Sequence, residues 1–404
     1  MNLDRQEAPL RRLMGPGPLD VHPRVYKALA SPVIGYLDPV YLNVLDRIGE
    51  LLPPVFGTKN RLTHATPGTG TSGMETCIAN LLEPGDRVLV CVHGFFGDRI
   101  RQMAERQDAQ VTVIEQEWGK PTDPEKVEAA LKQGSYKLLA LVHAETSTGV
   151  LQPMEDITRL AKAYDTMLML DTVSSLGGIE IKVDEWGVDA AFSCSQKCIG
   201  CPPGLSPITF SDRAIEMVKK RKHLVRSWYL DMTLLEKYWG PERVYHHTSS
   251  STLNYALLEA LLLIHEEGLQ NRFLRHRKNH KALVAGIEAL GLKMLVKPEY
   301  RLPTLNTIVI PEGVDDVKLR RYLLDKFKLD IGGGFGLLKG KVWRVGLMGY
   351  SCSADNVLFF IPALSRALAV QGVKTDLASG LDAVLSELDG DVVALPAKGA
   401  VAAS

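Results

Sequence analysis

Short apolar runs alternate with amphipathic stretches along the first half of the chain. The runs with the length and composition of buried strands are Arg87–Val92, Lys137–His143, Met167–Asp171, Ala190–Cys194 and Ser206–Phe210. Helical periodicity occupies Gly97–Gln107, Asp123–Gln133 and Asp156–Tyr164. Near-continuous apolar strands that alternate with helices are typical of a parallel sheet covered on both faces. The pattern therefore predicts an α/β fold with a mostly parallel sheet covered by helices.

The pattern changes in the second half of the chain. A helix-rich stretch covers residues 253–290. After it, short strands and helices predict a small α+β domain: Thr307–Ile310, Val317–Phe327, Lys341–Gly346 and Asn356–Ala369. We therefore divide the chain into an N-terminal arm (1–14), a large domain (15–270), a small C-terminal domain (271–372) and a tail (373–404). The tail is expected to hold one helix, Ala378–Leu388, and to fray beyond it.

Composition and charge narrow the range of partners. Lys+Arg and Asp+Glu both number 47 in the 404 residues, so the net charge is zero. This balance predicts neither a nucleic acid nor an anionic membrane as partner. The first residues lack the apolar core of a secretory signal, and no apolar run reaches the roughly 18 residues of a membrane span. The expected location is the cytoplasm.

Three of the six cysteines lie close together, at Cys194, Cys198 and Cys201. A metal or iron–sulfur site is one interpretation of this spacing. No second Cys or His cluster accompanies it, and Lys197 lies inside the run. We therefore predict no metal and interpret the three as buried reduced thiols.

Asp171 and Lys197 are the strongest candidates for chemistry. Asp171 ends one predicted strand, and Lys197 follows the next strand 26 residues later, which is about one β-α-β step. Ligands of open α/β sheets bind at the carboxyl ends of strands. A lysine and a carboxylate at such an edge suit pyridoxal 5'-phosphate (PLP), because the amine forms a Schiff base and the carboxylate keeps the pyridine nitrogen protonated.

A glycine-rich segment, residues 66–73, leads into a predicted helix at Met74–Leu82. Backbone N–H groups at such a helix start bind phosphate. Residues 68–73 also match the G-x-G-x-x-G pattern of dinucleotide-binding folds. The stretch before them, Asn60–Ala65, is a poor core strand, and Asp86 precedes its strand instead of following it. We therefore favour a single phosphate, with a plain connecting turn as the alternative.

Two further positions invite a ligand. Phe95 and Phe96 follow a strand end, where one ring could stack on a pyridine ring, although such rings are more often core residues. Arg344 lies among apolar residues of a predicted strand and needs an anionic partner. A substrate carboxylate and an internal salt bridge are equally compatible with the strand pattern.

Taken together, the motifs resemble the class V, fold-type I PLP-dependent aminotransferases of the alanine:glyoxylate, serine:glyoxylate and serine:pyruvate group. The resemblance runs from about residue 12 to about residue 370. It rests on Gly15-Pro-Gly-Pro18, Gly68-Thr-Gly70 with Glu75, Leu82-Glu-Pro-Gly-Asp86, Gly94-Phe-Phe-Gly97, His143-Ala-Glu-Thr-Ser-Thr-Gly149, Asp171-Thr-Val-Ser-Ser-Leu-Gly177, Ser195-Gln-Lys197, Tyr245-His-His-Thr248 and Arg344-Val-Gly346. It implies a fold-type I PLP-dependent transferase with a large domain and a small C-terminal α+β domain.

The resemblance also implies individual roles. Lys197 and Asp171 match the catalytic pair. The phosphate contacts match Thr69, Gly70, Thr71 and Gln196, and the ring contacts match Phe96, Thr146 and Val173. Phe96 stands where many members have Trp. The carboxylate contacts of the substrate match Arg344 and Gly17.

Two residues of the resemblance point outside the subunit. Tyr245 and Thr248 match positions that reach the cofactor phosphate of a neighbouring subunit. This implies a homodimer with both active sites at the interface. The substrates implied are small amino acids and 2-oxo acids, which react by ping-pong transamination.

A second resemblance, to the ureidoglycine:glyoxylate branch of the same family, competes with the first. It rests on residues 117–119, 183–186 and 343–352. Enzymes of that branch carry amide side chains near the amino donor, whereas the matching positions here are Tyr36 and Tyr245. A site without amides leaves a ureido group unpaired. The sequence therefore favours alanine or serine as donor and glyoxylate as acceptor.

Two other activities stay open on the residues alone. A cysteine desulfurase would need a nucleophilic thiol, for which Cys352 is the candidate. A nicotinamide dehydrogenase would use Gly68–Gly73 as its nucleotide loop.

Overall fold

The computed structural model describes residues 8–389, and a seven-stranded sheet forms its largest element. The strand order is β2 (Leu62–Pro67), β10 (Leu205–Phe210), β9 (Ala190–Phe192), β8 (Met167–Asp171), β5 (Leu138–Val142), β3 (Arg87–Val92) and β4 (Gln110–Glu115). All pairs from β9 to β4 are parallel, whereas β10 is antiparallel to both β9 and β2. This confirms the predicted α/β fold with a mostly parallel sheet.

Two strands differ from what the sequence led us to expect. The stretch Asn60–Ala65, interpreted as a poor core strand, contributes to the edge strand β2, whose first five residues are buried. Its Thr and His side chains concealed it, because β2 pairs on only one side and needs no continuous apolar run. β10 matches the strand expected at Ser206–Phe210 but runs antiparallel, since the connection from β9 is short and contains no helix.

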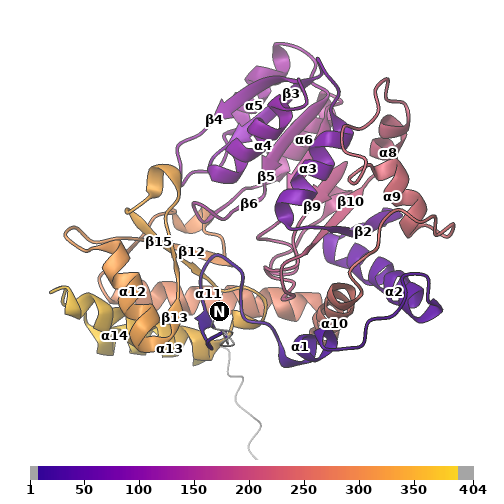
Figure 1. Cartoon of the computed structure of the whole chain (residues 1–404). Helices are drawn as coiled ribbons and strands as arrows, with labels where there is room; N and C mark the ends of the chain where they lie inside the picture. Colours follow the sequence, from indigo (N-terminus) through magenta and orange to yellow (C-terminus); the bar gives the residue numbers. More distant parts are fainter. Residues whose placement is uncertain (1–7, 390–404) are drawn as a thin grey trace, which may run out of the picture.

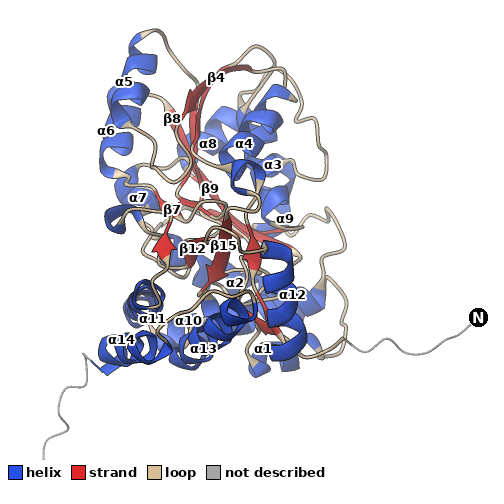
Figure 2. Cartoon of the chain, turned by 90° about the vertical axis from the view of Figure 1, so that its left-hand side faces the viewer, coloured by secondary structure: helices blue, strands red, loops and turns tan. Residues whose placement is uncertain are grey.

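Alternate residues of the strands face two separate apolar cores. On β5, Leu139 and Leu141 belong to one core, whereas Leu138 and Ala140 belong to the other. The first core is covered by α2 (Pro39–Phe56), α5 (Pro124–Lys132), α6 (Glu155–Ala163) and α10 (Ser251–Glu267). The second is covered by α3 (Gly70–Leu81), α4 (Phe95–Glu105), α8 (Asp212–Lys219) and α9 (Met232–Trp239). Figure 2 shows α5 and α6 on one side of the strands and α3, α4 and α8 on the other.

Polar residues fix where several of these helices begin. Asp123 accepts a hydrogen bond from the N–H of Glu125 at the start of α5. Ser211 accepts one from the N–H of Ala214 at the start of α8. Such N-caps stabilise a helix by about 1 kcal/mol each.

The C-terminal elements pack around a second sheet, which has four strands. Its strand order is β11 (Lys293–Met294), β12 (Leu305–Val309), β15 (Val342–Gly346) and β14 (Gly332–Gly333). The helices that pack around it are α11 (Leu269–Ala289), α12 (Asp316–Phe327), α13 (Ala354–Val370) and α14 (Leu377–Asp389). These elements gather at one end of the molecule (Figure 1).

The N-terminal segment also joins this end of the molecule. β1 (Arg12–Leu13) pairs in parallel with β13 (Leu329–Asp330), and Met14 is buried in the same apolar core. The smaller elements are α1 (Pro23–Leu29), β6 (Ala144–Glu145), β7 (Val150–Leu151), α7 (Val183–Trp186) and the 3-10 turns Pro298–Tyr300, Gly336–Leu338 and Gly349–Ser351. The expected helix Ala378–Leu388 lies within α14.

Residues 1–7 of the predicted arm and residues 390–404 of the predicted tail lie outside the described part of the chain. Within residues 8–389, none of the helices has both the length and the apolar character that crossing a membrane demands.

Candidate active site

The carboxyl ends of β8 and β9 bring Asp171 and Lys197 to one edge of the large sheet. Asp171 lies opposite Phe192, the last residue of β9, and Lys197 follows five residues later. Burial raises the pKa of the Asp171 carboxyl to about 7, while the N–H of Val173 and the nearby Lys197 charge act in the opposite direction. One carboxylate oxygen, Oδ1, accepts that N–H at 2.8 Å. Oδ2 has no hydrogen-bond partner among residues 8–389, so it is open to a ligand.

The amine of Lys197 is buried against the N-terminal turn. Nζ donates a hydrogen bond to the carbonyl of Pro16, and the side chain is packed on Gly17. Burial lowers the pKa of Lys197. In the described part of the chain no carboxylate lies within ion-pair distance of Nζ. A buried amine without an acidic partner loses its proton more easily than a solvent-exposed lysine does, as a nucleophile or base requires.

The loop from β2 to α3 lies beside this pair. Gly70 begins α3 and packs so closely that a Cβ atom there would lie 2.9 Å from Cγ2 of Val173 and 3.3 Å from Cβ of Cys194. Thr69 precedes the helix, but its hydroxyl caps no N–H group. The N–H groups of Gly70 and Thr71 have no partner within the described ranges. This helix start can therefore bind an anion.

Gln196 provides a second polar group near Lys197. Its Oε1 atom is buried and has no hydrogen-bond partner among the described residues. A buried amide without a partner is costly, so the position favours a ligand or a water molecule that pairs with it.

Arg344 reaches the site from β15 of the smaller sheet. The side chain is 2% exposed, and it donates from Nε to the carbonyl of Gly333 (2.8 Å) and from Nη1 to the carbonyl of Thr146 (3.1 Å). Within the part of the chain that the structure describes, it makes no ion pair, and Nη2 makes no hydrogen bond. The internal salt bridge, one of the two interpretations from sequence, is therefore absent. A buried guanidinium of this kind suits a carboxylate ligand.

The start of helix α4 brings two phenylalanine rings and a second arginine next to the site. Phe96, half-buried at the start of α4, packs edge-on against Phe95 with 5.5 Å between the ring centroids. Cζ of Arg99 lies 5.0 Å from the centroid of each ring, and Nη1 donates to Oγ1 of Thr71 at 3.1 Å. Arg99 was not predicted from the sequence. The available signal for it was its position one helical turn after Phe96.

Thr146 and Glu145 follow β5 in the chain and lie beside the residues described above. The Thr146 hydroxyl bonds to the hydroxyl of Ser174. Glu145 is fully buried and accepts the N–H groups of Phe96 (3.2 Å) and Gly97 (3.4 Å) at the start of α4. The sequence analysis also missed Glu145, which stabilises the turn that carries Phe96.

Three predicted residues do not join this group. Tyr36 and Tyr245 pack against each other with 4.9 Å between ring centroids, and the Tyr245 and Thr248 hydroxyls are 3.3 Å apart. Tyr245 is 54% exposed. No hydrogen bond, ion pair or ring contact within residues 8–389 connects these three side chains to Lys197 or Asp171. In this chain they form a separate group with each other.

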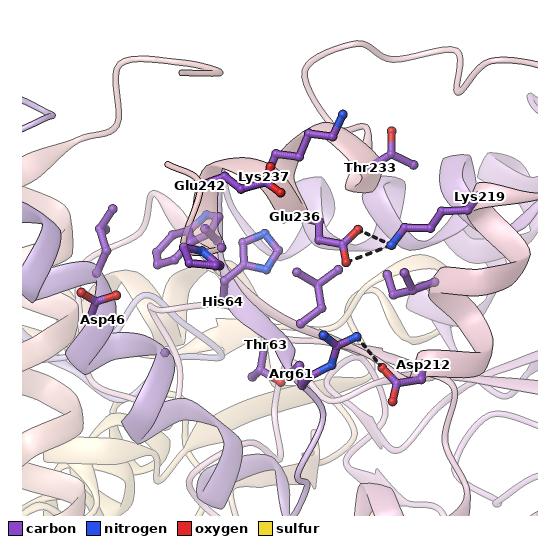
Figure 3. Close-up of a pocket in the computed structure, with 17 residues that line it drawn as sticks. Asp46, Arg61, Thr63, His64, Asp212, Lys219, Thr233, Glu236, Lys237 and Glu242 are labelled. Carbon is purple, nitrogen blue, oxygen red and sulfur yellow. Dashed lines mark hydrogen bonds and ion pairs between the residues drawn. The ribbon is translucent and has the colours of Figure 1, made fainter. Parts of the chain in front are cut away.

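A pocket of about 750 Å³ lies elsewhere, between α2, β2, α8 and α9 (Figure 3). Two ion pairs line it, Arg61–Asp212 at 3.2 Å and Lys219–Glu236 at 2.8 Å. None of the site residues predicted from sequence lines this pocket. The candidate residues around Lys197 therefore lie outside this pocket.

The geometry also weighs on the two other activities. Cys352 is buried after the 3-10 turn Gly349–Ser351, and burial raises the pKa of its thiol to about 11. Such a thiol is a poor nucleophile at neutral pH. β2, which precedes the glycine-rich loop, is antiparallel to its only neighbour. A dinucleotide loop would follow a strand of a parallel βαβ unit.

Known proteins resemble the chain over most of its length. The family model described as "Aminotransferase class-V" matches residues 55–336. An alanine–glyoxylate aminotransferase of Drosophila melanogaster is 40% identical over 377 residues, which are 92% of this chain and 96% of that protein.

Solved structures agree with this finding. The ureidoglycine–glyoxylate aminotransferase of Bacillus subtilis superposes with a TM-score of 0.93 at 39% identity, over 95% of this chain and 99% of that one. The alanine–glyoxylate aminotransferase of Nostoc sp. gives a TM-score of 0.90 at 50% identity, over 91% of this chain and 98% of that one.

Proposed function

Because the chain belongs to the class V aminotransferases, we propose that it transfers the amino group of alanine or serine to glyoxylate. The products are glycine and either pyruvate or hydroxypyruvate. As an aminotransferase, the enzyme takes an amino acid and a 2-oxo acid as substrates, and its cofactor is PLP.

The residues around Lys197 fit this cofactor. A buried amine without an acidic partner suits the cofactor aldehyde, and the free Oδ2 of Asp171 suits a protonated ring nitrogen. The open N–H groups at Gly70 and Thr71 suit a phosphate. Three independent features therefore agree with one molecule.

We assign the contacts to the cofactor as follows. Lys197 attaches it, and Asp171 binds the ring nitrogen. The phosphate is bound by Thr69, Gly70, Thr71 and Gln196, the ring faces by Phe96 and Val173, and the ring hydroxyl by Thr146. A flat ring bound between Phe96 and Val173 would stack on an aromatic ring on one side and on an apolar side chain on the other.

When bound, the cofactor supplies an aldehyde that attaches to amines and a cationic ring that withdraws electrons from Cα. Lys197 moves the proton at Cα of the amino donor. Its lowered pKa keeps more of the amine in the unprotonated form that a base requires. Asp171 maintains the positive charge of the ring. Burial destabilises the charged form of this carboxyl group and so raises its pKa to about 7. A cation beside the carboxylate offsets that destabilisation.

Arg344 binds the α-carboxylate of both substrates, with Gly17 beside it. The single observation that carries this proposal is the buried guanidinium with no acidic partner among residues 8–389. A dicarboxylate would need a second such cation, so a small monocarboxylate is the better match.

The choice of donor rests on Tyr36 and Tyr245, which lie apart from Lys197 in one chain and would meet the donor at the site of a second subunit. Both present an aromatic ring and one hydroxyl, and neither offers the paired donor and acceptor of an amide. This favours alanine or serine. Ureidoglycine is the second candidate, and the likeness to the Bacillus subtilis enzyme over 95% of this chain favours it.

We also infer that the enzyme is a homodimer. Exposed apolar side chains occur in the three segments that hold Tyr36, His246 and Tyr245 or precede them in the chain: Val33, Leu37, Val40, Leu224, Trp228, Tyr229 and Val244. Ring contacts connect Tyr36 to Tyr245, and Trp228 and Tyr229 to His246. Large apolar side chains that stay exposed in one chain are often covered at a subunit interface. A second copy would bring Tyr245 and Thr248 to the partner's cofactor phosphate.

Subunit mixing tests this arrangement. Lys197→Ala and Tyr245→Ala homodimers should each have little activity. Unfolded together and refolded, they should form heterodimers with one intact site, and about a quarter of the wild-type activity should return. If Lys197 and Tyr245 served the same subunit's site, mixing would restore nothing.

Donor choice is tested by half-reactions. Alanine or serine should convert the cofactor at least about tenfold faster than ureidoglycine. The reverse ranking would assign the enzyme to ureidoglycine. A Tyr245→Asn variant should shift the ranking toward ureidoglycine.

A further inference from the structure

Phe335 lies directly over the guanidinium of Arg344. The ring centroid is 3.9 Å from Cζ, and the side chain is 41% exposed. It belongs to the turn between β14 and β15, which is rich in glycine (Gly332-Gly-Gly-Phe-Gly336). A phenylalanine that is this exposed gains little free energy from burial. Burial therefore does not explain why its ring lies on the guanidinium plane of Arg344.

The turn that carries Phe335 is tightly packed and does not swing freely. A Cβ atom at Gly332 would lie 2.5 Å from Cδ of Pro16, and one at Gly334 would lie 2.0 Å from the carbonyl oxygen of Leu338. Gly336 has a φ of +47°, and a Cβ there would lie 2.8 Å from Cη2 of Trp118. These contacts fix the backbone on both sides of the ring.

Phe335 is also supported from the large sheet. Its ring centroid is 5.3 Å from that of Phe95, the neighbour of Phe96 at the start of α4. A continuous row of groups thus runs from Arg344 through Phe335 and Phe95 to Arg99. The row thus connects Arg344, the proposed carboxylate-binding residue, to Arg99, which contacts the proposed phosphate loop at Thr71.

The guanidinium of Arg344 therefore has one covered face and one open edge. Nε and Nη1 donate to the carbonyls of Gly333 and Thr146, which hold the plane in place. A carboxylate can bind in that plane at Nη2, the nitrogen without a partner. The side chain on the adjacent Cα can then extend next to Phe335, whose ring covers the face of the guanidinium.

We propose that Phe335 limits the size of the amino donor's side chain. Its ring is a fixed wall above Arg344 that admits a methyl or hydroxymethyl group and excludes branched or longer chains. The proposal rests on the carboxylate-binding role of Arg344 proposed above. It explains how a site that binds any α-carboxylate prefers small donors.

The test compares donors of increasing size with Phe335→Ala and Phe335→Leu enzymes loaded with PLP. kcat and KM are measured for alanine, serine, 2-aminobutyrate and leucine at saturating glyoxylate. In Phe335→Ala, kcat/KM for leucine relative to alanine should rise at least about tenfold. Phe335→Leu should show a smaller rise.

Phe359→Ala is the matched control, because Cζ of Arg12 lies 4.3 Å from the Phe359 ring and neither residue is assigned to the substrate or the cofactor. That change should leave the leucine-to-alanine ratio unaltered. An unchanged ratio in Phe335→Ala, with alanine activity retained, would overturn the proposal. Should Phe335→Ala fail to fold by circular dichroism, an unchanged ratio in Phe335→Leu would overturn it equally.

Arg344→Gln separates this inference from the proposed function. If it leaves KM for alanine and glyoxylate unchanged, Arg344 does not bind the carboxylate and the underlying proposal fails. If it raises both KM values while Phe335 variants keep the wild-type ratio, only the size limit fails.

Discussion

Lys197 and Gly17 touch although 180 residues separate them in the sequence. A Cβ atom at residue 17 would lie 2.8 Å from both Cδ and Cε of the lysine and 3.1 Å from Nζ. Gly17 also has a φ of +107°, which other residues rarely adopt. Since Met14 is buried in the C-terminal core, the N-terminal segment links that core to the reactive amine.

Gly17→Ala should therefore displace Lys197 and impair cofactor attachment. We expect a loss of most of the visible cofactor absorbance in protein purified with excess PLP, because the new methyl group competes with the lysine for space. Gly49→Ala is the control, since a Cβ at this position of α2 would meet no atom within 4 Å. Normal absorbance and activity in Gly17→Ala would contradict the tight packing.

Asp171→Asn should lower kcat by at least about 100-fold while the protein still folds. An amide cannot keep the ring nitrogen protonated, so proton removal from Cα slows. Asp189→Asn is the matched control, because Asp189 is buried at the same sheet with a raised pKa but accepts the N–H of Leu168 and the hydroxyl of Ser211. It should lower thermal stability and leave kcat per folded enzyme intact. Equal losses of kcat would show that Asp171 acts only structurally.

Arg99→Gln should weaken PLP binding by about tenfold, because Arg99 makes no ion pair within residues 8–389 and contacts the phosphate loop at Thr71. The measurement is the dissociation constant of PLP from fluorescence titration at two salt concentrations. Arg101→Gln serves as the control, since Arg101 in the same helix pairs with Asp98 and Glu105. Equal PLP affinity in wild type and Arg99→Gln would exclude a phosphate role.

His64→Leu should stabilise the protein, most of all in acid. His64 is 1% exposed, neither ring nitrogen has a partner in the described part of the chain, and burial lowers its pKa to about 3. In the unfolded chain histidine titrates near 6.5, so the unfolded state binds more protons between these values and stability falls as the pH drops below about 6.5. The loss is at most about 1.4 kcal/mol per pH unit.

Thermal unfolding at about pH 7.5 and about pH 5 measures this effect. We expect His64→Leu to raise the free energy of unfolding by about 1–2 kcal/mol near neutrality and by more in acid. His223→Leu is the control, because that side chain is 63% exposed. An equal drop in stability with pH in wild type and His64→Leu would refute the assignment.

The sequence predicted the elements whose apolar pattern is continuous. Arg87–Val92 and Met167–Asp171 match β3 and β8 at both ends, because both strands are central and bury both faces. It missed β2 at the edge of the sheet, where Thr63 and His64 interrupt the apolar run. It also missed β4, which lies at the other edge and is partly exposed.

The residues of the site divide in the same way, into those that a local sequence pattern identifies and those that it does not. Lys197, Asp171 and Gly70 could be found because strand order fixes where they emerge. Arg99, Glu145 and Phe335 could not, because their importance lies in contacts between elements that no local pattern encodes. For Arg344, only the structure removed the internal salt bridge as an explanation, since that required every acidic neighbour to be located.

The most direct test of the central claim follows the visible absorbance of the purified, PLP-loaded enzyme during one half-reaction and its reversal. Addition of alanine or serine should bleach the band of the lysine-bound cofactor, and glyoxylate should restore it with one equivalent of glycine formed. Lys197→Ala should show neither change. If neither amino acid bleaches the wild-type band, or if bleached enzyme fails to recover with glyoxylate, the proposed transamination is wrong.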